Sequence, residues 1–200
     1  MNAARDHRYR SAMWIFLGSE TLLFAGLFAL YGAYQSQYPV EFAAAGARSI
    51  AWIGLVNTLV LLTSSYFVAS AIAYARAGRM RRAATSLVIT LALGAAFLGF
   101  KLAEWHMHLA EGFAPGHAYS SAELPGAGAS LFFTLYYLMT GLHALHVIAG
   151  MIIIGCLVLS ITAGRITRPR HLVLELGGLY WHFVDIVWLF LWPLFYLVHP

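Results

Sequence analysis

The sequence has few charged residues, and this shortage excludes an ordinary soluble protein. Only 10% of its 200 residues are charged and 61% are hydrophobic, whereas soluble domains have about 25% charged and 45–50% apolar residues. A soluble chain of this length needs a charged surface, which eight acidic and twelve basic residues cannot supply. We therefore expect an integral membrane protein with a single domain.

Cysteine is also scarce, and its scarcity excludes several kinds of site. Cys156 is the one cysteine of the chain, so there is no disulfide framework, Cys-x-x-Cys pair or iron–sulfur ligand set. The net charge of +4 does not indicate nucleic acid, because the basic residues form short clusters between apolar runs rather than one binding face. We expect no nucleic-acid partner.

Five long apolar runs dominate the chain. A bilayer core needs about 20 helical residues, and suitable runs cover residues 13–34, 50–75, 83–110, 128–162 and 172–198. Spans of this kind are helical because lipid cannot satisfy unpaired backbone groups. The sequence therefore predicts an all-α polytopic bundle of five transmembrane helices over residues 13–198, preceded by a polar N-terminal segment over residues 1–12.

The placement of the basic residues predicts an orientation. Ten of the twelve lie before the first run or in the second and fourth connections; they are Arg5, Arg8, Arg10, Arg76, Arg79, Arg81, Arg82, Arg165, Arg168 and Arg170. Because cytoplasmic loops are rich in Lys and Arg, these segments are expected inside. The N-terminus would then be cytoplasmic and the C-terminus outside. The cluster formed by Arg76, Arg79, Arg81 and Arg82 is also a candidate binding site for anionic lipid headgroups.

Ionisable residues inside the runs are the candidates for function, because they are costly in a membrane. They are Glu20, Lys101, Glu104, His108, His143, His146, Glu175, His182 and Asp185. Glu20 falls in the predicted cytoplasmic half of the first run, so residues of that half on the last run, His182 and Asp185, are its candidate neighbours. A proton-linked role for Glu20 and a plain hydrogen-bonding role are both open at this point.

Helical spacing also gives several of the other polar residues a purely structural interpretation. His182 and Asp185 can form one hydrogen-bonded pair that fixes helix packing. Lys101 and Glu104 can neutralise each other, and Glu104 can also reach His108. A histidine pair such as His143 and His146 lacks the further ligands of a closed metal site, so we expect no metal and no haem in this chain.

Several segments resemble subunit III of haem–copper terminal oxidases. Residues 180–190, Tyr-Trp-His-Phe-Val-Asp-Ile-Val-Trp-Leu-Phe, resemble the closing helix of that family, and residues 141–147 resemble its Gly-x-His-x-x-His-Val segment. Ser19-Glu20 resembles the Ser-Glu pair of the corresponding helix. Residues 55–65 and the segment around Glu104 also fit. The resemblance covers nearly all of residues 13–198 and corresponds to a five-helix bacterial form.

The resemblance implies a function and partners. It implies a non-catalytic subunit that packs beside subunit I, with subunit II in the same complex, in the cytoplasmic membrane of a bacterium. Haem and copper would belong to the partner subunits, and this chain would bind phospholipid and support proton uptake and the stability of subunit I during aerobic electron transport. Glu20 would be the carbodiimide-reactive acid of the family. Lys101 has no counterpart in the family pattern.

Three other functions are compatible with the residues. Two have similar sequences: a five-helix subunit associated with nitric oxide reductase, and the subunit III of a quinol oxidase. A stand-alone proton-coupled transporter would use the buried acids for translocation. The chain has no internal inverted repeat, which argues against that transporter.

Overall fold

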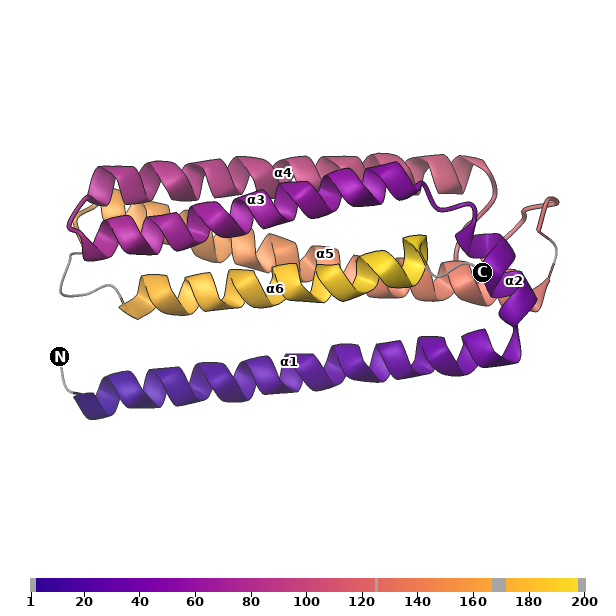
Figure 1. Cartoon of the computed structure of the whole chain (residues 1–200), viewed down its shortest axis with the longest axis horizontal. Coiled ribbons are helices and arrows are strands. Elements are labelled where there is room, and N and C mark those ends of the chain that lie inside the picture. The colour runs from indigo at the N-terminus through magenta and orange to yellow at the C-terminus, as the bar shows by residue number, and fades with distance from the viewer. Residues whose placement is uncertain (1–2, 125, 167–171, 198–200) are drawn as a thin grey trace.

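The computed structural model describes residues 3–124, 126–166 and 172–197, and every regular element in these ranges is a helix. Five of the helices are long and apolar enough to cross a membrane (Figure 1); they are α1 (Ala3–Gln37), α3 (Ala51–Arg76), α4 (Met80–Ala110), α5 (Ala127–Thr162) and α6 (Leu172–Tyr196). A short helix, α2 (Pro39–Gly46), and a 3₁₀ turn, η1 (Gly116–Ala118), lie in the connections. The predicted all-α bundle with five spans is confirmed.

Two boundaries differ from those expected. The polar segment over residues 1–12 is not separate, because α1 is helical from Ala3; this stretch has no Gly or Pro and is rich in Ala and Arg, which favour helix. The short helix α2 was not expected; it begins with Pro39 at its first position, where the missing N–H of proline costs nothing. The predicted end of the last span at residue 198 lies outside the described residues.

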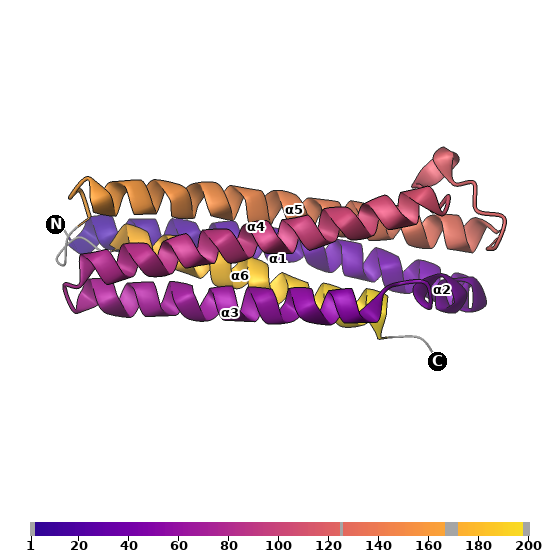
Figure 2. The same cartoon turned by 90° about the horizontal axis from the view of Figure 1, so that it is seen from above.

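The ends of the bundle separate the arginines. Figures 1 and 2 show the start of α1, the α3–α4 connection and the start of α6 at one end, with α2 and the α4–α5 connection at the other. The described arginines near the start of α1, in the α3–α4 connection and before α6 therefore lie at one end, which we call the arginine-rich end. At the opposite end, Arg48 pairs with Glu123 at 2.6 Å. Arg168 and Arg170 lie outside the described residues.

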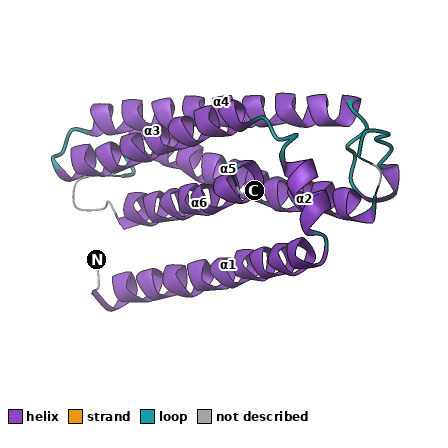
Figure 3. Ribbon diagram, turned by 45° about the vertical axis from the view of Figure 1, so that its right-hand side comes forward, coloured by secondary structure: helices purple, strands orange, loops and turns teal. Residues whose placement is uncertain are grey.

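The connections at the arginine-rich end are tight because glycine closes the helices. After α3, Gly78 has a φ of 77°, Arg79 N–H donates to the Tyr74 carbonyl at 2.8 Å and Gly78 N–H donates to the Ala75 carbonyl at 3.0 Å. This double hydrogen bond is the Schellman motif, which needs a left-handed residue after the helix. Gly164, with a φ of 70°, closes α5 in the same way. Figure 3 shows how short the resulting loop between α3 and α4 is.

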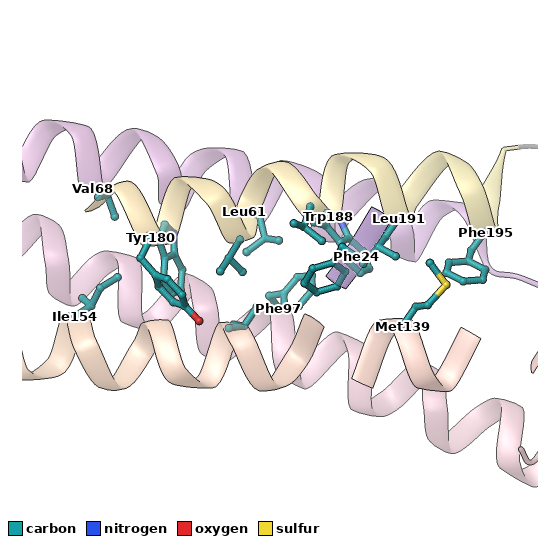
Figure 4. Close-up of a cluster of buried hydrophobic side chains, with 14 of the residues drawn as sticks. Phe24, Leu61, Val68, Phe97, Met139, Ile154, Tyr180, Trp188, Leu191 and Phe195 are labelled. Atoms are coloured by element: carbon teal, nitrogen blue, oxygen red, sulfur yellow. The ribbon is translucent and has the colours of Figure 1, made fainter. Parts of the chain in front are cut away.

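The core lies between α3, α4, α5 and α6 and is rich in aromatic rings (Figure 4). Trp188 and Phe97 meet edge to face at 4.8 Å between ring centroids. The helix α1 packs at one side of this group, against α5 and α6. It buries Leu17, Phe24 and Tyr31, which are spaced by seven residues, while most of its apolar surface faces outward. An outward apolar face is what a bilayer requires of a peripheral span.

Candidate functional site

The carboxylate of Glu20 meets a histidine half-way along α1. Glu20 Oε2 lies 3.0 Å from His146 Nε2 on α5, and the two side chains are 18% and 14% exposed. The other ring nitrogen of His146, Nδ1, lies 2.8 Å from the Leu142 carbonyl oxygen one turn earlier on α5. The ring of Phe24 packs edge-on against the imidazole at 5.3 Å. This pair joins α1 to the rest of the bundle through a polar contact inside a span.

The expected neighbours of Glu20 on α6 lie elsewhere. His182 Nδ1 lies 2.6 Å from the Ser65 hydroxyl on α3, and the buried Asp185 carboxylate also has Ser65 as its neighbour. The hydrogen bond considered between His182 and Asp185 is not formed: His182 bonds Ser65, and by hydrogen-bond geometry neither carboxylate oxygen of Asp185 has a partner among the described residues. These contacts with α3 could not be predicted, because spacing along one helix does not show which neighbouring helix each of its faces contacts.

The pair expected between Lys101 and Glu104 is present and is fully buried. Lys101 Nζ donates to Glu104 Oε2 at 3.0 Å and to the hydroxyls of Tyr136 and Tyr196 at 2.8 Å each. The Tyr196 hydroxyl donates to Glu104 at 2.7 Å. Lys101 and Glu104 are 1% and 0% exposed. All three ammonium hydrogens thus have acceptors from α4, α5 and α6, which is the condition for holding a charge away from water.

The two remaining core histidines are held by aromatic rings rather than by polar partners. His108 does not bond Glu104 as considered; its ring packs against Phe133 and Tyr136 at 5.6 Å and 5.4 Å. His143 is 0% exposed and packs against Trp188 at 5.3 Å. Within the described ranges, the nitrogens of both rings have no hydrogen-bond partner. Buried polar atoms of this kind are the usual sites of internal water.

Sequence reasoning assigned no contact to three of the residues that complete these sites. Tyr136 and Tyr196 bind Lys101, and Ser65, which lies in the segment 55–65 quoted for the resemblance, binds His182. A tyrosine in an apolar run normally indicates packing, although its hydroxyl needs a partner when buried. The useful signal was that a fully buried lysine needs three acceptors, which Glu104 alone cannot provide.

Glu175 is the centre of a basic cleft at the arginine-rich end. Its carboxylate accepts hydrogen bonds from Arg10 at 3.1 Å and from Arg76 at 2.7 Å. These three residues line a cleft of about 300 Å³ between α1, α3 and α6; its lining also includes Trp14, Ile72, Leu176, Leu179 and His182. Of the four arginines proposed for lipid, Arg76 lines this cleft and Arg81 lines a second hollow between α4 and α5. All four are exposed, and Arg79 and Arg82 line neither of these two hollows.

The structure also has an apolar groove, and its described residues show whether a metal site is present. A groove of about 300 Å³ runs between α1 and α6 and is apolar except for Thr21; Phe24, Phe28, Phe183 and Phe190 are among its walls. In the part of the chain that the structure describes, no three His, Cys, Asp or Glu side chains come together as a metal site.

A family profile described as cytochrome c oxidase subunit III matches residues 2–199. The chain belongs to the cytochrome c oxidase subunit III family. Together with five membrane-spanning helices, this membership makes it a multi-pass membrane subunit of haem–copper terminal oxidases and confirms the resemblance stated above.

Relatives from several organisms have names that agree with this family. The chain is 31% identical to a cytochrome c oxidase subunit 3 of Thermostichus vulcanus, over 92% of this chain and 84% of the relative. It is 30% identical to a cytochrome bo(3) ubiquinol oxidase subunit 3 of Pseudomonas aeruginosa, over 96% and 89%. It is also 30% identical to a heme-copper oxidase subunit I+III of Aeropyrum pernix, over 96% of this chain and 23% of that longer protein. These names favour an oxidase subunit over the reductase-associated and transporter alternatives.

Proposed function

We propose that this chain is a non-catalytic subunit III that sustains proton uptake by the redox-active subunits of its oxidase. The resemblance assigns haem and copper to the partner subunits, in the cytoplasmic membrane of a bacterium. A relative whose name joins subunits I and III in one protein supports direct contact with subunit I.

The observation that carries the proposal is the acid in the middle of α1. Glu20 is largely buried and bonds one histidine, and no lysine or arginine of the described chain forms an ion pair with it. An acidic group at this depth is costly, so a purely structural role would be served better by an amide. We therefore infer that an ionisable group is present at this depth because it gains and loses a proton during function.

The test compares oxidase complexes that contain wild-type chain, Glu20→Gln or Glu20→Ala. Glutamine is nearly isosteric, so we expect Glu20→Gln to assemble and to keep initial oxygen consumption within about twofold of wild type, a change of ~0.4 kcal/mol in the barrier. Carbodiimide labelling of the chain should be lost, proton release per oxygen should fall modestly, and activity should decay earlier over many turnovers. Equal rate, proton release and durability for both variants and wild type would contradict the proposal.

The same proposal includes bound phospholipid at the arginine-rich end. Arg10 and Arg76 line a cleft whose other walls are mostly apolar, which suits an anionic headgroup together with an acyl chain. The apolar groove between α1 and α6 offers a second place for a chain. Phospholipid analysis of the purified complexes should find less anionic lipid after Arg10→Gln and Arg76→Gln together, with Arg79→Gln, which does not line the cleft, as the control.

The orientation is part of the proposal as well. The described arginines of the N-terminus and of the α3–α4 connection share one end of the bundle, and the positive-inside rule makes that end cytoplasmic. A reporter enzyme fused after Gly78 should therefore be active only inside the cell, and one fused after Pro200 only outside. Opposite labelling of the two fusions would reverse the orientation.

A further inference from the structure

We propose that Glu20 and His146 form a single proton-sharing unit, which holds one exchangeable proton between α1 and α5. The inference rests on the proposed proton-linked role of Glu20 and adds the histidine as the residue that positions and shares its proton. It follows from the hydrogen bonds on the two sides of one imidazole ring.

The first step concerns the side of the ring that faces its own helix. His146 Nδ1 lies 2.8 Å from the Leu142 carbonyl oxygen. A carbonyl oxygen only accepts hydrogen bonds, so Nδ1 must carry the hydrogen. In a neutral imidazole only one nitrogen carries a hydrogen. The helix backbone therefore fixes the tautomer and leaves Nε2 as the nitrogen that can take up a proton.

The second step concerns the side of the ring that faces α1. Nε2 and Glu20 Oε2 are 3.0 Å apart, and a bare Nε2 and an ionised carboxylate are both acceptors that would repel each other. The contact therefore needs one proton between them. Either protonated Glu20 donates to Nε2, or the imidazolium Nε2–H donates to the Glu20 carboxylate. Passing the proton from Oε2 to Nε2 interconverts these two forms and leaves the pair with no net charge in both.

The third step concerns the groups around the pair. Among the described residues, no other charged side chain pairs with Glu20 or His146. Two titratable groups lie near the pair: Tyr180 on α6, whose hydroxyl donates to the His146 carbonyl at 3.2 Å, and His143 on α5, which packs against Trp188. His182 and Asp185 on α6 face Ser65 of α3, and α1 brings Phe24 and Leu17. Among the described residues, His146 is the one side chain that hydrogen-bonds the Glu20 carboxyl group.

The test uses the intact oxidase complex and measures protonation rather than activity. The carboxyl stretch of Glu20, identified by its loss in Glu20→Gln, is titrated by infrared spectroscopy, and His146 is titrated by nitrogen-15 NMR. We expect both signals to share one midpoint in the wild type. In His146→Gln, whose amide cannot take up a proton, the carboxyl midpoint should move by at least about one pH unit, a tenfold change in the ratio of protonated to ionised acid.

The control is Tyr180→Phe, which removes a neighbouring hydroxyl but leaves the pair in contact, and its midpoint should match wild type. A shift of less than about 0.3 pH unit in His146→Gln, or separate midpoints for the two wild-type signals, overturns the shared proton. If His146→Gln does not assemble, the wild-type and Glu20→Gln spectra decide the matter, because the His146 titration should change when its partner cannot ionise. A moved midpoint with unchanged turnover would support the pair and contradict only the proposed function.

Discussion

Replacing Trp181 with alanine should lower the free energy of unfolding by about 3–5 kcal/mol, the range for truncating a buried large aromatic side chain. Trp181 is 0% exposed, and its indole Nε1 donates to the Ser64 hydroxyl on α3 at 3.0 Å. The ring also presses on backbone: a Cβ added to Gly150 of α5 would lie 2.8 Å from it, and one added to Gly94 of α4 would lie 3.0 Å away. One side chain thus fills the space between four helices.

The measurement is denaturant unfolding of the reconstituted chain, followed by helical circular dichroism. Trp14→Ala is the matched control, because Trp14 is 65% exposed on α1 and its truncation should change stability by no more than about 0.5 kcal/mol. Trp181→Phe should fall between wild type and Trp181→Ala. A loss below about 1 kcal/mol for Trp181→Ala would mean that the helices close around the missing ring and that the packing against glycine is not required.

Replacing Lys101 with methionine should also destabilise the chain by about 3–5 kcal/mol, because it leaves the Glu104 carboxylate buried without its counter-charge. The tyrosine hydroxyl that bonds Glu104 cannot supply a positive charge. Methionine fits the volume of the lysine stem, so the loss reports the charge rather than a cavity. We expect the purified variant to unfold at a lower denaturant concentration than wild type.

A double variant tests whether the loss in Lys101→Met comes from the unpaired charge of Glu104. In Lys101→Met with Glu104→Gln no buried charge is left unpaired, so a large part of the loss should be recovered, as for other buried pairs replaced together. Arg48→Met is the exposed control: Arg48 and Glu123 are 2.6 Å apart with side chains 44% and 65% exposed, and such pairs contribute about 0–1 kcal/mol. Strict additivity of the two single losses at Lys101 and Glu104 would contradict coupling between them.

The sequence predicted what depends on one helix at a time. Apolar length located five spans, and the expected bounds of α3 and α5 fall within one residue of those found. Spacing of three residues predicted the Lys101–Glu104 pair, because both residues lie on one face of α4. The α1 start was missed because helix continues past the apolar run into polar residues, where hydropathy gives no signal.

Contacts between helices could not be predicted in the same way. Glu20 was given neighbours on α6 because His182 and Asp185 were expected at a similar depth, yet α1 turns Glu20 toward His146 on α5. Tyr136 and Tyr196 reach Lys101 from α5 and α6, and no spacing in their own helices indicates that meeting. Depth follows from position in a span, whereas the rotation of each helix about its axis follows from packing against its neighbours.

The separation of Glu20 from His146 by 126 residues has a consequence for biogenesis. Translation proceeds at about 5–20 residues per second, so α1 leaves the ribosome roughly 6–25 s before His146 does. During that interval the insertion machinery or the lipid must accommodate an acidic helix whose partner has not yet been synthesised, at the cost that an unpaired acid carries in a membrane. Docking of α1 is therefore a late event in assembly, and chains truncated before α5 should leave their first helix exposed to membrane quality-control proteases.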